Sequence, residues 1–451
     1  MKIKILLWSV VSILIIGLAA GTYWWLRRPQ VITFSDDSKV TLLAVEYGKR
    51  HVPPTVKAST TSTNKAPVRR GGSFTTTNDT LVVWVRQEYD SNQYHYFQFY
   101  SYDKAGMGCV GNFMTHNVNN GRRTGNDIVG IEFSAFPRRQ GKFLLGVQEQ
   151  SNNGQEMADQ KFAIRNPVRG SFTAWAPEPL SATQEDDDLS VTLTKLALGA
   201  DMPYQVDQDN ADDPVNKGVQ AAFHVERNGK PVTNWQPVSV VTTDATGNMT
   251  SWNWTPNSGV PSTQWNDNEG SMTYQYGLWP DEPAWKIKFE FSQQTDFADS
   301  ELWTVQGIPL QPGRQRDFNT NARNSRTNAA VAETDLGGVH LKIVPAKKFT
   351  DAGQNNYLQG GLTIQVDPVL PDGMRMTLVK LTDDQTNDVT YFDYGMMRNM
   401  TGTTGATTYR FGLRDIDGIT NLNLTIALHK SRFVEFTAKP EKAVAAVAAA
   451  Q

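Results

Sequence analysis

The chain divides into one long apolar segment and a much longer region in which short apolar runs alternate with polar residues. Residues 5–26 carry no charged side chain, and basic residues flank them at Lys4 and Arg27. Because an α-helix rises about 1.5 Å per residue, roughly 20 apolar residues cross a hydrocarbon core of about 30 Å. Trp24 stands where an interfacial aromatic belt would lie. The pattern predicts a single transmembrane helix within residues 1–30.

A cleaved signal peptide is the alternative for this segment. Its apolar region is usually about 7–15 residues long and ends at a small-residue cleavage site. Ala19-Ala20-Gly21 has suitable residues, but aromatic side chains follow it directly. We therefore expect an uncleaved signal anchor, with the lipid bilayer as its partner and the bulk of the single-pass chain outside the cytoplasm.

After Pro29 the apolar pattern changes to a period of two, in runs rich in Val, Ile, Thr and aromatic residues. Examples are residues 40–45, 81–85 and 286–291, which are bounded by Gly, Pro, Asn or Asp. Such runs favour half-buried strands, and Asn228-Gly229 is a strong hairpin-turn signal. The expected fold is mostly β, with the single N-terminal transmembrane helix followed by two or three tandem antiparallel β-sandwich-like domains.

A weak internal repeat guides the division into domains. Residues 40–48 and 191–199 share an apolar pattern with a closing glycine, and residues 339–344 resemble their start. Each expected domain also ends with a strand, a turn and a second strand that stops at a proline. The expected divisions are an anchor at 1–30, a first β domain at 31–168 with a polar insertion at 49–79, a Trp-rich second domain at 169–310, a linker or long loop at 311–337, a third domain at 338–440, and a disordered tail at 441–451.

Charge and cysteine content narrow the function. With 43 basic and 46 acidic residues the net charge is −3, whereas a dedicated nucleic-acid-binding protein needs a basic surface. We therefore expect no nucleic-acid partner. The single cysteine, Cys109, excludes a disulfide within the chain and a cysteine-based metal cluster. The acidic run at residues 185–188 is interpreted as solubilising charge.

Most of the 12 tryptophans fall in the expected second domain. Trp252 and Trp254 are two residues apart, which puts their side chains on one side of a strand. If exposed, these two residues with Trp265 and Trp279 would form a flat platform for sugar rings; if buried, they would form an aromatic core. Since tryptophan is usually mostly buried, the core is preferred and the carbohydrate platform is the alternative.

An acidic loop is the one candidate metal site. Asp207, Asp209, Asp212 and Asp213 place four carboxylates within a short stretch, and calcium prefers six to eight hard oxygen ligands. The order of residues differs from the helical calcium-binding loop. A solvated acidic loop is therefore preferred, calcium is the alternative, and no other cofactor is expected.

No catalytic motif is present, so we expect a protein that is not an enzyme. The six histidines lack zinc-binding spacing, and the nucleophile-elbow, phosphate-loop and dinucleotide signatures are missing. If there is an activity, glycoside hydrolysis by two carboxylates is the simplest. The expected function is a membrane-anchored envelope protein that binds or assembles through its β domains. The alternatives are a carbohydrate-binding or glycoside-processing protein, and a tethered accessory subunit of a membrane complex with a protein partner.

Overall fold

The computed structural model describes most of the chain that follows the predicted anchor. The described residues are 30–55, 69–70, 73–90, 96–104, 108–113, 126–150, 160–168, 170–201, 217–253, 263–274, 277–315, 330–350, 358–398 and 407–442. Within these ranges no helix combines the length and the apolar character that crossing a membrane requires. The predicted anchor at residues 1–30 lies outside them, except for its last residue.

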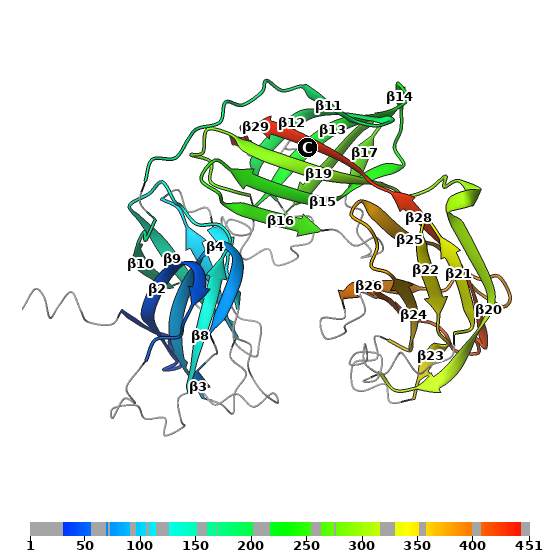
Figure 1. The fold of residues 1–451 in the computed structure, drawn as a ribbon. Helices are drawn as coiled ribbons and strands as arrows, with labels where there is room; N and C mark the ends of the chain where they lie inside the picture. The colour runs from blue at the N-terminus through cyan, green and yellow to red at the C-terminus, as the bar shows by residue number, and fades with distance from the viewer. Residues whose placement is uncertain are drawn as a thin grey trace, which may run out of the picture. The chain divides into compact units, whose positions relative to one another are not determined.

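The described residues are mostly β, as the alternating pattern predicts, and form several largely antiparallel sheets. The chain makes two compact units (Figure 1). The N-terminal unit runs to Thr173 and includes Thr246–Asn248, and the C-terminal unit contains the rest. The strands of the N-terminal unit are β1 (Val31–Thr33), β2 (Lys39–His51), β3 (Arg69–Arg70), β4 (Phe74–Glu88), β5 (Tyr96–Tyr102), β6 (Gly108–Val110), β7 (Asn112–Phe113), β8 (Asn126–Phe133), β9 (Lys142–Gln150) and β10 (Gln160–Arg165).

Two sheets of the N-terminal unit share one hydrophobic core. Their strand orders are β1-β2-β4-β8-β3, with β7 beside β8, and β10-β9-β5-β6. Val83 of β4, Phe99 of β5 and Val147 of β9 are fully buried in this core. The expected polar insertion at 49–79 is corrected in part, because β2 continues to His51 and β4 already begins at Phe74. The start of β4 is rich in Thr and Asn, so it lacks the apolar alternation by which strands are recognised in a sequence. Backbone pairing between strands does not require that alternation.

The C-terminal unit begins with a second pair of sheets. Their orders are β11-β12-β13-β18-β17, with β14 and β30 beside it, and β16-β15-β19-β29 (Figure 1). The ring centroids of Phe223 and Phe291 are 5.3 Å apart across the two sheets. The strands are β11 (Ala182–Asp186), β12 (Leu189–Asp201), β13 (Lys217–Arg227), β14 (Lys230–Pro231), β15 (Trp235–Asp244), β16 (Met249–Asn253), β17 (Gln264–Asn266), β18 (Glu269–Tyr274) and β19 (Trp285–Gln293).

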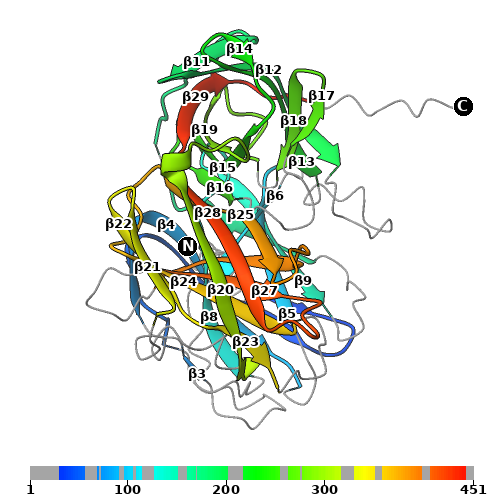
Figure 2. The same cartoon turned by 90° about the vertical axis from the view of Figure 1, so that its right-hand side faces the viewer.

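Nine of the remaining strands form one sheet around a third core, whereas β29 and β30 belong to the preceding pair of sheets. Its order is β21-β22-β24-β23-β20-β28-β25, and β27 joins β26 to β24 (Figure 2). Leu341, Ile364 and Ile426 are fully buried in it. The elements are η4 (Asp299–Glu301, a 3-10 turn), β20 (Leu302–Gly313), β21 (Ala332–Leu336), β22 (Val339–Ile343), β23 (Ala346–Phe349), β24 (Gly360–Asp367), β25 (Met374–Asp383), β26 (Tyr391–Arg398), β27 (Thr407–Leu413), β28 (Asn421–Lys430), β29 (Arg432–Ala438) and β30 (Glu441–Lys442).

The three parts are structural repeats, which we call the first (β1–β10), second (β11–β19) and third (β21–β28) repeat. Each opens with a hairpin, and the strand orders β1-β2-β4-β8, β11-β12-β13-β18 and β21-β22-β24-β27 correspond. The β2–β4 and β12–β13 pairs even share a bulge, between Leu42 and Ala44 and between Leu193 and Lys195. The similarity of residues 40–48 and 191–199 therefore reflects equivalent strands.

The final strands of the second and third repeats are exchanged. In the first repeat β10 pairs with the strand before it, β9. By contrast, β20 follows β19 but pairs with β28, and β29 follows β28 but pairs with β19. The expected domain boundaries at residues 310, 338 and 440 assume that each strand pairs within the domain of its chain neighbours. Because β20 and β29 pair with strands of the other repeat, they do not follow these boundaries. Glu441–Lys442, expected in the disordered tail, pair as β30 with β12.

Candidate functional site at the strand crossover

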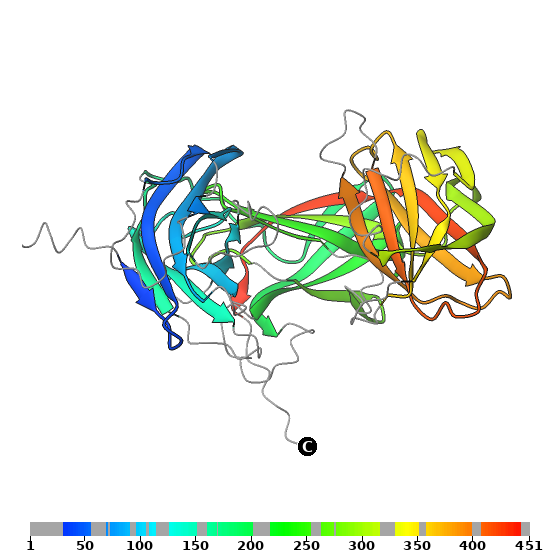
Figure 3. The same ribbon diagram turned by 90° about the horizontal axis from the view of Figure 1, so that it is seen from below.

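The chain passes from the third repeat into the second through a single residue. Ser431 lies between the end of β28 and the start of β29. The chain continues through it from a sheet of the third repeat into a sheet of the second (Figure 3). The Ser431 amide donates a hydrogen bond of 2.7 Å to the Gly373 carbonyl oxygen. Gly373 has a φ of +79°, and a Cβ there would lie 3.1 Å from the Phe433 ring. One intervening residue is too short for a hairpin, so β29 has to leave the third repeat.

A partly buried ion pair joins the repeats beside this crossover, with the Glu290 side chain 11% and the Arg375 side chain 37% exposed. Arg375 of β25 donates from Nε to Glu290 Oε1 at 2.6 Å and from its terminal nitrogen to Oε2 at 2.5 Å. Glu290, on β19, is 9% exposed. Burial raises the pKa of Glu290, but the hydrogen bonds and the charge of Arg375, together with smaller effects of Ser431 and Lys288, outweigh it and hold that pKa below its usual value. The pair is bidentate, which fixes the orientation of β25 against β19.

A buried histidine lies on the other side of Arg375. His429 of β28 is the direct cross-strand partner of Arg375 and is 2% exposed. Its Nε2 is 3.0 Å from the Thr377 hydroxyl, and its ring centroid is 4.9 Å from that of Phe297. Burial lowers the pKa of His429 to about 4, so the imidazole is neutral near pH 7. A hydroxyl beside an imidazole is also the arrangement of an activated nucleophile, but here both groups are buried, which favours a structural role.

An arginine-carboxylate cluster fixes the start of β29 to the second repeat. Arg432 donates from Nε and a terminal nitrogen to Asp188 Oδ1, at 3.1 and 2.9 Å, and Arg227 Nε donates to Asp188 Oδ2 at 2.6 Å. The Phe433 amide donates to Asp186 Oδ2 at 2.6 Å. Both guanidinium groups lie over the Trp235 ring, at 5.7 and 5.8 Å from its centroid. The acidic run at 185–188 is therefore more than solubilising charge. Asp186 and Asp188 bind the first residues of β29, which lie far along the chain.

Asp188 is expected to carry most of this attachment. Partial burial raises its pKa, but the hydrogen bonds from Arg227 and Arg432 outweigh it and keep the pKa below its usual value. Hydrogen bonds to charged groups contribute about 1.5–3 kcal/mol. We expect Asp188→Asn to lower the free energy of unfolding by about 2 kcal/mol in urea titrations at pH 7. Asp187→Asn is the control: the Asp187 side chain is 76% exposed, and its pair with Arg432 is worth about 0–1 kcal/mol. Equal effects of the two substitutions would contradict this assignment.

The structure separates the tryptophans of the alternative carbohydrate platform. Trp279 is 2% exposed, so it cannot face a ligand. Trp252 is half-buried on the inward side of β16, 6.5 Å from the Tyr274 ring of the opposite sheet, and Trp265 is half-buried 6.0 Å from the Phe223 ring. Trp254 lies outside the described residues. Trp279 therefore cannot be part of an exposed platform. Trp252 and Trp265 lie at the margin of the aromatic core.

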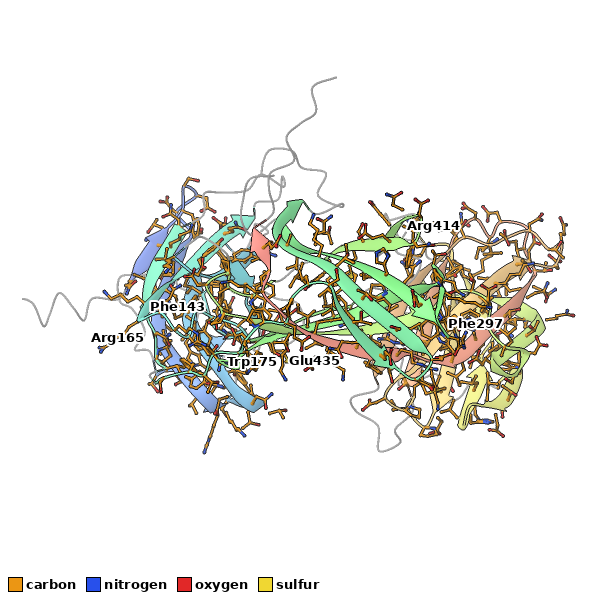
Figure 4. The ribbon with its side chains drawn as sticks, turned by 90° about the horizontal axis from the view of Figure 1, so that it is seen from above. Phe143, Arg165, Trp175, Phe297, Arg414 and Glu435 are labelled. Atoms are coloured by element: carbon orange, nitrogen blue, oxygen red, sulfur yellow. The ribbon has the colours of Figure 1, made fainter. Side chains whose placement is uncertain are left out.

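A partly exposed tryptophan lies elsewhere, at Trp175 before the second repeat. The Lys286 Nζ atom is 5.3 Å from the Trp175 ring centroid and 3.3 Å from Glu435 Oε1. Trp175 and Glu435 are labelled in Figure 4. The Glu178 amide also donates to the Thr437 carbonyl oxygen at 2.7 Å. Residues 175–178 therefore cover the outer edge of β29, an arrangement that no local sequence signal reveals.

The candidate calcium loop lies outside the described residues, with Asp207, Asp209, Asp212 and Asp213 all included. Across the residues that are described, no three His, Cys, Asp or Glu side chains are grouped in a way that could hold a metal ion. The calcium site stays a prediction.

The crossover residues were not recognised from the sequence. Glu290 and Arg375 are 85 residues apart, and Asp188 and Arg432 are 244 residues apart. The one available signal was the spacing of the apolar patterns around Ser431, which leaves no room for a turn. Comparisons with protein-family models and with characterised proteins find no match to this sequence.

Proposed function

We propose that this chain is a membrane-tethered, non-catalytic envelope protein whose β-sandwich repeats act as a binding or assembly module outside the cytoplasm. The lipid bilayer is its proposed partner through residues 1–30, and a protein is its proposed partner through the repeats. No cofactor is proposed, and calcium at the acidic loop remains the alternative. The observation that carries the proposal is the exchange of β20 and β29 between two repeats.

The exchange supports an assembly role because it couples two repeats mechanically. Separate tandem domains move relative to one another unless their interface is large and apolar. Here each repeat contributes a strand to the core of the other, and the Glu290–Arg375 pair joins them beside the crossover. A body of this kind presents surfaces on both repeats in a fixed relation, which suits a scaffold. An enzyme would instead need an accessible group with a tuned pKa. At the crossover Glu290 and His429, whose pKa values are shifted, are buried.

The tether is tested by fractionating cells that express the full chain or a chain starting at residue 30. We expect the full chain to stay with membranes in high salt and at alkaline pH and to need detergent for extraction, because about 20 apolar residues are inserted in lipid. The shorter chain should be soluble. A full chain that is released with its first residues intact would contradict the tether.

The assembly role is tested on native membranes extracted in a mild detergent. We expect a discrete complex larger than the 50.2 kDa chain on a native gel, and a purified chain starting at residue 30 should compete for the same partner. A chain that is always monomeric in such extracts would contradict the proposed role while leaving the tether intact.

A further inference from the structure

We propose that the crossover is an acid-sensitive joint: protonation of His429 places a second cation beside Arg375 in the buried contact and releases the start of β29. This inference goes beyond the proposed function, because it concerns how the coupling between two repeats responds to its surroundings. It rests on the position of His429 at the crossover.

His429 lies where a small change acts on both repeats. It is two residues before Ser431, the residue through which the strand passes between the sheets. Thr377 of β25 and Phe297, from the segment before η4, contact its ring. An imidazolium ion in this place would lose its hydration, and the nearest hydroxyl is a weak substitute for water.

Burial, and not the surrounding charges, is the main reason that the His429 ring is neutral. Arg375 on β25 disfavours a second positive charge, whereas Glu301 of η4 and Glu290 of β19 favour it. Glu290 already accepts two hydrogen bonds from Arg375, and a backbone hydrogen bond at Lys430 also favours the charged ring. Burial is the largest effect, and together with Arg375 it keeps the ring neutral.

Opening the joint removes this restriction. Water then reaches the ring, and His429 binds a proton with its ordinary pKa of about 6.5. Because the closed joint has the lower value, about 4, protons bind preferentially to the open form between these two values. Stability of the closed joint is therefore complete above about pH 6.5 and is lost as the pH falls towards 4. From pH 7.5 to pH 5 the ratio of open to closed joint should rise about 30-fold.

The test is hydrogen exchange of the full chain in detergent, followed by mass spectrometry. The informative peptide spans residues 428–434, whose Ser431 and Phe433 amides are hydrogen-bonded across the joint. After correction for the intrinsic rate at each pH, protection of this peptide should fall about 30-fold between pH 7.5 and pH 5. Protection of residues 362–366, in the core of the third repeat, should stay the same.

Matched histidine variants identify the responsible group. His429→Gln cannot be protonated, so its 428–434 peptide should show no acid-dependent loss; His429→Met serves the same purpose if the first variant folds poorly. His340→Gln is the control: His340 is on β22, and hydrogen bonds from it to Asp335 and Glu333 raise its pKa. It should respond to acid like the parent chain. The proposal is overturned if His429→Gln keeps the full response, if the parent shows none, or if residues 362–366 lose protection equally.

Discussion

A chain that ends at Lys430 is expected to lose the fold of its second repeat, although the strands of that repeat begin more than 100 residues earlier. The missing strand, β29, buries Val434 and Phe436 in the second core, at 3% and 1% exposure. Burial of such side chains contributes about 1.5–3 kcal/mol each, and whole domains are stable by only about 5–15 kcal/mol. The loss should appear as a missing cooperative transition in tryptophan fluorescence during urea titration, together with early proteolysis within residues 182–293.

The control for this truncation is a chain that ends at Lys442. It keeps β29 and β30, and with them every described strand. Its unfolding midpoint should match that of the full chain. If both truncated chains unfold alike, or if the chain ending at Lys430 keeps the full transition, the exchange of β29 into the second repeat is wrong.

Removal of Arg375 is expected to cause the largest loss of stability among single substitutions at the crossover. Arg375→Met keeps much of the side-chain volume but leaves the Glu290 carboxylate buried without its partner. Breaking a fully buried pair in this way typically costs about 3–5 kcal/mol, and the 37% exposure of the Arg375 side chain puts this pair at the lower end of that range. We expect the free energy of unfolding to fall by about 3 kcal/mol in urea at pH 7. The pKa of Glu290 should then rise, because the hydrogen bonds and charge of Arg375 no longer oppose the effect of burial. The deficit should therefore narrow as the pH falls towards 4.

Lys286→Met is the matched control on the same face of β19. The Lys286 and Glu435 side chains are 41% and 49% exposed, so their pair is worth about 0–1 kcal/mol. A second check is the double variant of Glu290→Gln and Arg375→Met, which should lose less stability than the sum of the single variants. Additive losses would show that the two side chains do not act as a pair.

The strand-rich fold was predictable because period-two alternation is a local property of the sequence. Runs such as 286–291 already show which side chains face a core. Asn228-Gly229 likewise forms the predicted turn, with φ values of 52° and 72°. The repeat was recognisable from residues 40–48 and 191–199 for the same reason, since equivalent strands carry equivalent patterns.

Strand pairing and the candidate site depended on contacts that no local pattern encodes. An apolar strand such as β29 fits the edge of either sheet, and only the length of the connection at Ser431 and the partners of Arg432 decide between them. The exposure of the tryptophans was harder still to predict. Trp279 is buried, whereas Trp252 is half-buried with its ring 6.5 Å from that of Tyr274 in the opposite sheet. Burial of an aromatic residue is set by distant neighbours, and composition does not reveal them.

The exchanged strand also sets the order in which the protein is completed during synthesis. Domains generally fold from the N-terminus as the chain emerges, and the first repeat, which keeps its own β10, is free to do so. The second repeat has to wait with the edge of β19 uncovered until residue 438 has been made, after nearly all of the third repeat. A nascent chain therefore carries an unpaired sheet edge from residue 293 to residue 438, and such edges are prone to aggregation. We therefore expect folding of the second repeat to be helped by a chaperone that shields this edge until β29 has been made.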